Sequence, residues 1–332
     1  MKAPVEDFAA QRLSRWDRSP LRNSRGAEKV ARLTARDHEV FKLLARYRYL
    51  PADFIHAFVG GSLKGLTHHL NVLKRKPNYY LACPEQQRQS AAANYRHLIY
   101  ELDARGAEIL AAEGIRAARR QHRNFAHEVM ACQILASLEL GTLSLPSCRF
   151  ISWAEIVQHP RFPESTRRAP SPHACPVKFT HRGREHSFEL CADCLPFGIQ
   201  RPHDGRAAYI FCPGIEADTG SEPVEPSDFE RSSLCRKFAG YLSLIDRETY
   251  KSRWGLPILF VPFITTTERR MRSIMACLDR LTNGAGSNRI VFTACPSIYS
   301  FDEPLRPGGS MLTRNWERVG HPLFSFVERA RP

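Results

Sequence analysis

Our prediction of the fold starts from the stretch Tyr209-Ile210-Phe211-Cys212-Pro213-Gly214-Ile215-Glu216-Ala217-Asp218. Its apolar part predicts a short β-strand that ends in two acids one residue apart. Side chains two residues apart on a strand leave the same face, so we expect Glu216 and Asp218 to point the same way. The alternative is that both acids are simply solvated, because acidic side chains are mostly exposed.

Residues on both sides of this stretch extend the pattern. Upstream, a second expected strand from Phe188 to Asp193 also ends in an acid. Downstream, an expected helix from Ser227 to Ile245 carries Lys237 and Tyr241. These two residues are four apart, and they therefore lie on one face of that helix.

Together these groups predict one catalytic site at the ends of the strands. Carboxylates bind hard divalent cations such as Mg²⁺, which is therefore the candidate cofactor, and a nearby lysine could position the attacking water. The candidate catalytic residues are Asp193, Glu216, Asp218, Lys237 and Tyr241, and the first three are also the candidate metal ligands.

The overall charge of the chain favours an acidic polymer as its partner. The 332 residues carry a formal net charge of +14, and most of the excess lies before residue 150. Ten cysteines without a paired framework, and no signal-like start, predict a reducing, cytoplasmic location. The longest apolar run, Leu256 to Ile264, is too short to span a bilayer, so no membrane partner is expected.

We expect three parts along the chain. Residues 1–30 would be a flexible basic arm, 31–115 a winged helix-turn-helix domain, and 116–332 an α/β domain. Arginines rich among polar residues could lie along DNA phosphates, although a disordered solubilising tail has the same composition. The arginines of the arm are Arg12, Arg15, Arg18, Arg22 and Arg25.

The second part follows the order helix, helix, helix, hairpin. The helices are expected to begin at Thr34, Pro51 and Ser62, and the two strands to cover 79–83 and 97–102. That order is typical of a winged helix-turn-helix, whose third helix enters the major groove. A plain bundle with a solvated polar face is the alternative.

The third helix supplies the candidate DNA contacts. Its leucines line one side and leave amide, hydroxyl, imidazole and cationic groups on the other, and such groups suit base edges and phosphates. The candidate DNA-binding residues are Lys64, Thr67, His68, Asn71, Lys74 and Arg75.

Beyond a basic connector (Arg116 to Arg123) and a helix capped by Asn124, the chain predicts strands and helices that build an α/β layer with parallel neighbours. On the capped helix, His127-Glu128 could be catalytic, but a structural histidine is favoured. Zinc bound through Cys191-x-x-Cys194 is disfavoured, because no second pair accompanies it. The expected elements are strands 150–157, 177–180, 187–193, 257–263 and 289–293, with a helix at 267–281 and a closing element at Trp316 and 324–327.

Joined together, these features resemble the replication-relaxation family of bacterial and mobile-element proteins. That family is similar to winged-helix DNA binders fused to a PD-(D/E)xK, or restriction-endonuclease-like, α/β domain, and it is associated with plasmid replication, mobilisation or DNA relaxation. The resemblance rests on the helices of 34–73, the segment Tyr100 to Gly106, the helix of 124–138, Asp193, Glu216-Ala217-Asp218 and Lys237-Phe238-Ala239-Gly240-Tyr241.

One departure from the nuclease pattern divides the functional expectations. The lysine expected two residues after Glu216 is Asp218, although Lys237-x-x-x-Tyr241 is similar to the Gln-x-x-x-Tyr motif of RecB-like and lambda-exonuclease-like members, and Lys237 could take the missing role. We therefore expect a sequence-specific or structure-guided double-stranded DNA-binding protein with a degenerate nuclease-like domain. It would be a regulator or accessory factor in plasmid or mobile-element replication, mobilisation or transcription, with proteins of those processes as partners and a dimer as the oligomer considered. The alternative is a Mg²⁺-dependent endonuclease or nickase guided by the winged helix.

Overall fold

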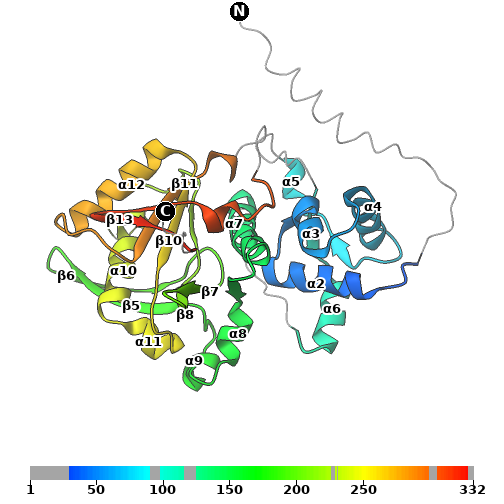
Figure 1. The fold of residues 1–332 in the computed structure, drawn as a ribbon, viewed down its shortest axis with the longest axis horizontal. Helices are drawn as coiled ribbons and strands as arrows, with labels where there is room; N and C mark the ends of the chain where they lie inside the picture. Colours follow the sequence, from blue (N-terminus) through cyan, green and yellow to red (C-terminus); the bar gives the residue numbers. More distant parts are fainter. Residues whose placement is uncertain are drawn as a thin grey trace, which may run out of the picture. The chain divides into compact units, whose positions relative to one another are not determined.

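The computed structural model describes residues 30–89, 98–115, 125–225, 229, 231–298 and 305–327, which form a mixed α+β fold (Figure 1). The chain divides into two compact units, residues 1–52 with 59–120, and residues 53–58 with 121–332. The arginines of the predicted arm and connector, and the Asn124 cap, lie outside the described residues. Within the described ranges, no helix has the length and apolar character needed to cross a bilayer.

The first unit begins with helices whose starts follow from their caps. In α2 (Ala35–Tyr47), Thr34 and Asp37 form the predicted capping box, in which the Asp37 carboxylate accepts from the Thr34 amide at 2.8 Å. Helix α3 (Ala52–Val59) follows in the chain, although its residues 53–58 are grouped with the second unit. Helix α4 (Leu63–Lys74) starts where the Ser62 hydroxyl accepts from the Gly65 amide. These three helix starts confirm the sequence prediction within one or two residues. The short α5 (Gln86–Gln89) and α6 (Ala104–Ala112) follow.

A small antiparallel sheet completes this unit. Its strands are β1 (Leu50–Pro51), β2 (Leu81–Ala82) and β3 (Ile99–Leu102), in the order β1-β3-β2. Strands β2 and β3 lie inside the predicted hairpin segments, whereas β1 was not predicted, because two residues carry no readable alternation. Behind the sheet, the rings of Phe41 and Tyr80 pack with their centroids 5.8 Å apart.

The second unit is built on a five-stranded sheet with the order β13-β12-β11-β10-β9. Strands β9 (Glu216–Asp218), β10 (Val261–Thr265) and β11 (Ile290–Ala294) are parallel, as predicted. Strands β12 (Trp316–Arg318) and β13 (His321–Phe324) add an antiparallel edge, which confirms that the tail packs back as a closing element. The β9 end of this sheet carries the candidate acids.

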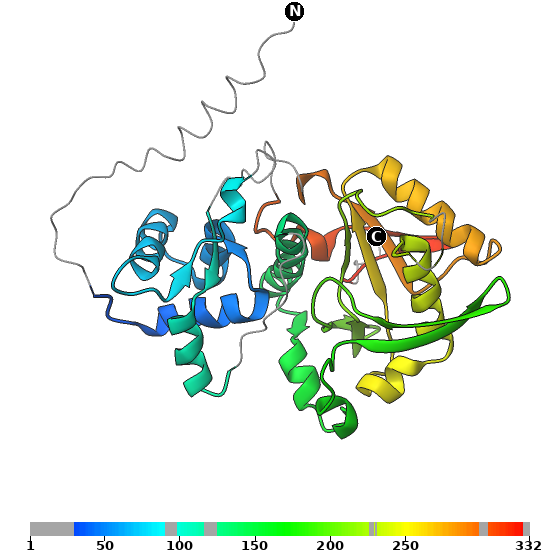
Figure 2. The same ribbon diagram turned by 180° about the vertical axis from the view of Figure 1, so that it is seen from behind.

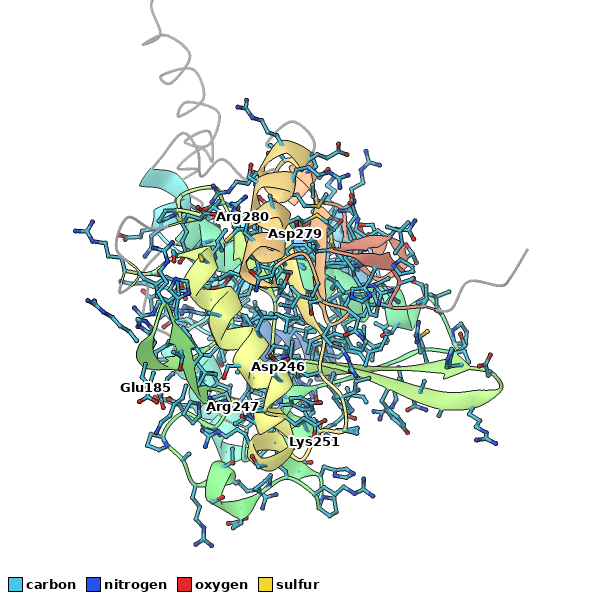
Figure 3. The ribbon with its side chains drawn as sticks, turned by 90° about the vertical axis from the view of Figure 1, so that its left-hand side faces the viewer. Glu185, Asp246, Arg247, Lys251, Asp279 and Arg280 are labelled. Atoms are coloured by element: carbon cyan, nitrogen blue, oxygen red, sulfur yellow. The ribbon has the colours of Figure 1, made fainter. Side chains whose placement is uncertain are left out.

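Two crossover helices cover one face of the five strands, α10 (Leu234–Asp246) and α12 (Glu268–Leu281) (Figure 3). Both connections step along the sheet in the same direction, so right-handed crossovers place both helices on the same side. Along the chain, the short α11 (Thr249–Trp254) follows α10 and precedes β10. The Phe238 ring of α10 packs 4.7 Å from Phe263 and 5.9 Å from Phe292, centroid to centroid, and burying one such side chain stabilises the fold by roughly 1.5–3 kcal/mol.

Smaller elements surround this sheet (Figure 2). A three-stranded antiparallel sheet has the order β4-β7-β8, and a separate hairpin of β5 and β6, turning at the predicted residues 181–184, lies against α10. The bounds are β4 (Arg149–Ile151), β5 (Cys175–His181), β6 (Arg184–Leu190), β7 (Phe197–His203), β8 (Arg206–Cys212), α7 (Phe125–Leu143), α8 (Trp153–Gln158), α9 (Glu164–Arg167), η2 (Pro296–Ile298) and α13 (Ser310–Thr313).

The stretch that opened the prediction is not one strand. Its first part belongs to β8 in the three-stranded sheet, and Glu216 to Asp218 form β9 in the five-stranded sheet. The change of sheet occurs at Gly214, which has φ 135° and lies so close to its neighbours that a Cβ would sit 2.3 Å from the Cys194 carbonyl oxygen. Only glycine fits there, and the prediction of a continuous strand missed this break.

Four further boundaries differ from the prediction. The strand expected at 150–157 stops at Ile151, because Ser152 and Glu155 form a capping box that starts α8. Strand β6 ends at Leu190, three residues before Asp193. Helix α10 begins after a Ser233 cap rather than at residue 227, and β10 covers 261–265 rather than 257–263.

Candidate carboxylate site and the face of helix α4

Glu216 lies at the start of β9, where its side chain is buried beneath α10. Lys237 Nζ donates to its Oε2 at 2.9 Å, and the Tyr241 hydroxyl donates to its Oε1. The four-residue spacing of Lys237 and Tyr241 brings both groups to the same carboxylate, as the helical periodicity predicted. Lys237 Nζ also lies 3.1 Å from the Glu222 carboxylate. One ammonium group therefore joins two acids.

The charges in this cluster depend on one another. Burial raises the pKa of Glu216 to about 7, although the nearby Lys237 opposes the rise. Burial alone would lower the pKa of Lys237, but Glu216, Asp193 and Glu222 together raise it well above its ordinary value. Burial and the Glu216 charge raise the pKa of Tyr241 well above its ordinary range, which keeps the phenol protonated. Lys237 is thus the permanent cation of the cluster, and Glu216 titrates near neutrality.

Asp193 lies beside the backbone of β9 rather than at the end of a strand. Its Oδ2 accepts from the Ala217 amide at 2.8 Å and lies 3.3 Å from His127 Nε2, which in turn is 2.6 Å from the Ala217 carbonyl oxygen. Because β9 is an edge strand, Asp193 and His127 satisfy backbone groups that a further strand would otherwise pair. This contact matches the structural role that we favoured for His127.

Asp193 and His127 stabilise each other's charged forms. Burial would lower the pKa of His127, but its hydrogen bond to Asp193 and the charge of that acid raise it overall. Burial would likewise raise the pKa of Asp193, while Lys237 and His127 lower it overall. The pair is therefore a carboxylate beside an imidazole that protonates readily.

Asp218 is held by a different helix. Arg270 on α12 donates Nε to its Oδ2 at 3.0 Å and Nη2 to its Oδ1 at 3.1 Å. Thr265 Oγ1 donates to Oδ2 at 2.8 Å, and the Gly220 amide donates to Oδ1 at 3.1 Å. Arg270 was not among the candidate site residues, yet it makes a bidentate ion pair with a buried acid. Its position in the first turn after the Thr267 cap was the available signal.

The three acids therefore do not share one set of ligands, because each has its own protein partners. Glu216 is engaged by α10, Asp218 by α12, and Asp193 by the β9 backbone. Over the part of the chain that the structure describes, no group of three or more His, Cys, Asp or Glu side chains is arranged to hold a metal ion. Carboxylates remain the right ligand type for Mg²⁺, but here cationic side chains occupy the oxygens that would bind it.

The candidate face of α4 is only partly open. Lys64, His68 and Arg75 are exposed. Thr67 Oγ1 donates to the Leu63 carbonyl at 2.8 Å, and Asn71 Nδ2 donates to the Thr67 carbonyl at 3.0 Å, so both side chains return to their own helix.

Lys74 and His69 of α4 also differ from the predicted surface. Lys74 is half-buried, with its Nζ 6.0 Å from the centroid of the Tyr100 ring. The outward orientation that we expected for Lys74 and Asn71 therefore needs correction. His69, which was not a candidate, lies 2.7 Å from the carboxylate of the capping residue Asp37 and so ties α4 to α2.

The chain matches no protein-family model, and comparison with curated proteins and with solved structures finds no match either.

Proposed function

We propose that this chain is a non-enzymatic double-stranded DNA-binding protein, with a winged helix-turn-helix over residues 31–115 and a degenerate PD-(D/E)xK-like α/β domain over residues 116–332. The observation that carries the proposal is the exposed polar face of α4, where the cations Lys64 and Arg75, the latter at the C-cap, accompany the imidazole of His68. In this proposal the replication-relaxation resemblance explains why the two kinds of unit occur in one chain.

The topology of the first region supports the winged-helix proposal. Its elements run helix, strand, helix, helix, strand, short helix, strand, and the first strand pairs with the last. In a winged helix-turn-helix, such a sheet supports the third helix while that helix lies in the major groove. Exposed cations on α4 would then contact phosphates and base edges.

The partners of Asp218 support the loss of nuclease chemistry. A metal-dependent nuclease needs carboxylate oxygens turned toward a cation and the scissile phosphate. Arg270 takes both oxygens of Asp218, and Lys237 with Tyr241 takes both oxygens of Glu216. These contacts favour a scaffold in which ion pairs have replaced the metal.

The Mg²⁺-dependent endonuclease or nickase remains the second candidate, because one observation favours it. Lys237 contacts Glu216 at 2.9 Å, which is where a lysine that had moved from the position of Asp218 would act. In that function Asp193 and Glu216 would hold Mg²⁺ and Lys237 would position the water.

The role proposed for the whole protein is that of a regulator or accessory factor acting on plasmid or mobile-element DNA in the cytoplasm. Its partners would be proteins of replication, conjugation or transcription. Half-site spacing on the DNA would reveal whether it binds as a dimer.

Duplex binding by single variants tests the proposal. With a fluorescently labelled duplex selected from random DNA, Lys64→Ala and Arg75→Ala should each weaken binding, by roughly 1–3 kcal/mol where a base contact is lost. Lys42→Ala is the matched control, because Lys42 is a partly exposed lysine of α2 paired with Glu39 at 3.1 Å. Equal affinities for all three variants and the wild type would refute the placement on α4.

Plasmid cleavage separates the two candidate functions. The proposed binder leaves supercoiled plasmid intact in Mg²⁺ or Mn²⁺. Nicking by the wild type that disappears in Glu216→Ala would establish the nuclease instead.

A further inference from the structure

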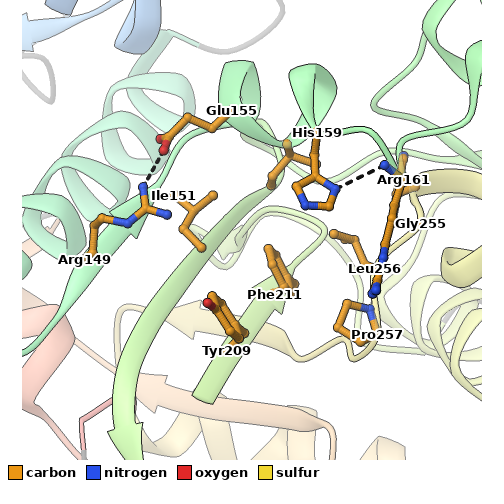
Figure 4. Close-up of a pocket in the computed structure, with 12 residues that line it drawn as sticks. Arg149, Ile151, Glu155, His159, Arg161, Tyr209, Phe211, Gly255, Leu256 and Pro257 are labelled. Carbon is orange, nitrogen blue, oxygen red and sulfur yellow. Dashed lines mark hydrogen bonds and ion pairs between the residues drawn. The ribbon is translucent and has the colours of Figure 1, made fainter. Parts of the chain in front are cut away.

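A hollow of about 620 Å³ lies in the second unit, away from the carboxylate cluster (Figure 4). Its lining combines apolar side chains with a few polar and charged ones, among them two arginines, as is typical of small-ligand sites of this size. The lining includes two aromatic residues of β8, Tyr209 and Phe211. Its charged and polar side chains include Arg149 of β4, Glu155 of α8, and His159 and Arg161 of the loop after α8.

The walls are fixed by close backbone contacts. Gly255 has φ 67°, and a Cβ there would lie 2.2 Å from the Arg161 carbonyl oxygen, so only glycine permits this approach. Trp254, which is buried, donates its indole N–H to the Pro172 carbonyl at 2.9 Å. Arg167 donates to the carbonyls of Val157 and Phe162, which hold the loop from both ends. The hollow is therefore formed before any ligand arrives.

Two parallel aromatic rings face into this hollow from alternate positions of β8. Tyr209 and Phe211 have an interplanar angle of 7° and a centroid separation of 6.2 Å. Tyr209 is 43% exposed, which is unusual for a large aromatic side chain in this protein. An exposed flat ring beside a second, parallel ring offers a stacking surface for a planar aromatic ligand.

The charge at the rim favours an anion next to that planar group. Arg149 pairs with Glu155, and Glu155 also accepts from the Ser152 amide at 2.8 Å, so the one acid of the lining is already engaged. His159 Nδ1 accepts from the Arg161 amide at 3.2 Å, which leaves the proton of the neutral ring on Nε2 as a donor. Arg161 runs down the wall beside Gly255 (Figure 4).

We propose that this hollow binds one nucleotide, with the base stacked on Tyr209 and the phosphate held by Arg161 and His159. The ligand must combine a planar aromatic group with an anion, and a nucleotide supplies both. The net charge of +14 supports a nucleic-acid source over a neutral aromatic ligand. The site does not depend on α4, so it is independent of duplex binding by the first unit.

The same chemistry can come from a free mononucleotide or from one nucleotide of a single strand. Titrations of the full-length protein with thymidine monophosphate and adenosine monophosphate, and with a labelled single-stranded thymidine oligonucleotide, distinguish the two sources. Binding of the strand alone assigns the hollow to single-stranded DNA, and binding of the monophosphates alone assigns it to free nucleotides. Wild-type protein that binds none of these probes overturns the proposal.

Variants at Tyr209 and Arg161 test the residues. Tyr209→Ala should weaken binding of the successful probe about fivefold or more, because a stacked base is lost, whereas Tyr209→Phe should retain it. Leu323→Ala is the matched control, since Leu323 is also a strongly exposed large apolar side chain. Arg161→Gln should weaken binding more than Arg269→Gln, which removes an exposed arginine on α12.

Duplex affinity measured on the same variants keeps this test separate from that of the proposed function. Tyr209→Ala should leave duplex binding unchanged, and Arg75→Ala should leave binding of the single-stranded or mononucleotide probe unchanged. A Tyr209→Ala variant that binds the probe as tightly as the wild type, or a control variant that loses as much, overturns the proposed site.

Discussion

Helix α4 and the acids of strand β9 both have cationic side chains nearby, but the cations have different surroundings in the two regions. On α4, Lys64 and Arg75 are exposed to solvent. At the strand ends, Lys237 and Arg270 are largely buried and paired with Glu216 and Asp218. A positive charge can attract a polyanion only where the fold has not already neutralised it. In the proposed function, the exposed cations of the first region would contact DNA, whereas we expect the buried pairs of the second region to contribute to stability.

Removing the cation at the strand ends should have the largest effect. Lys237→Met leaves Glu216 buried without its ammonium partner and should lower the free energy of unfolding by about 3 kcal/mol in urea titrations. Lys251→Met is the matched control, because Lys251 forms an exposed pair with Glu248 and should cost less than about 1 kcal/mol. Adding Glu216→Gln to Lys237→Met should recover part of the loss. A Lys237→Met variant as stable as Lys251→Met would contradict the assignment.

The pH dependence of stability should show more directly how the buried Glu216 contributes to the second region. The pKa of Glu216 is raised from 4.5 to about 7, so the folded state holds this proton more tightly than the unfolded state. The corresponding stabilisation is complete below pH 4.5 and is lost as the pH rises through 7, a change of up to about 3 kcal/mol. Glu216→Gln lacks this titration, so its stability relative to the wild type should rise between about pH 5 and pH 8. A constant difference would place the titrating proton elsewhere.

The salt dependence of duplex binding probes the α4 side of the comparison. Lys64→Ala should reduce the slope of log K against log salt by about 1, as expected for one lost phosphate contact. Lys74→Ala should change the slope less, because Lys74 is half-buried beside the Tyr100 ring. Equal salt slopes for Lys64→Ala and Lys74→Ala would contradict the expectation that the more exposed lysine makes the phosphate contact.

The smallest expected effect is that of Mg²⁺ on thermal stability. With Lys237 and Arg270 on the acids, millimolar Mg²⁺ should leave the Tm of the wild type unchanged in calorimetry. A ligand that bound the folded state would raise the Tm by linkage. A rise of the Tm in Mg²⁺ that Glu216→Ala abolishes would show that the acids still bind metal, and it would favour the nuclease alternative.

Local signals in the sequence predicted much of the fold. Thr34, Ser62 and Thr267 mark helix starts because a capping side chain satisfies amides within three residues. The contact of Lys237 and Tyr241 with one group likewise follows from helical periodicity alone. Where the same signal was overlooked, at Ser152 and Glu155, a helix was mistaken for a strand.

Long-range pairings were not predictable in the same way. The partner of Asp218 is 52 residues away on α12, and its identity depends on the register of β9 against β10. A one-residue slip of a strand turns every side chain to the other face, and no local pattern fixes that register for a strand of three residues. The predicted site included Lys237 but not Arg270, so the cation that α12 supplies to Asp218 was missed.

The switch at Gly214 has a consequence for how the second unit opens. Strands β8 and β9 belong to different sheets and are joined by a few residues that contact Cys194. We therefore expect that β9 cannot separate from its sheet without disturbing β8. Amide hydrogens on the two strands, such as those of Ile210 and Ala217, should then exchange with solvent through one shared opening reaction rather than two. We therefore expect the aromatic hollow and the acid cluster to be lost in the same opening reaction.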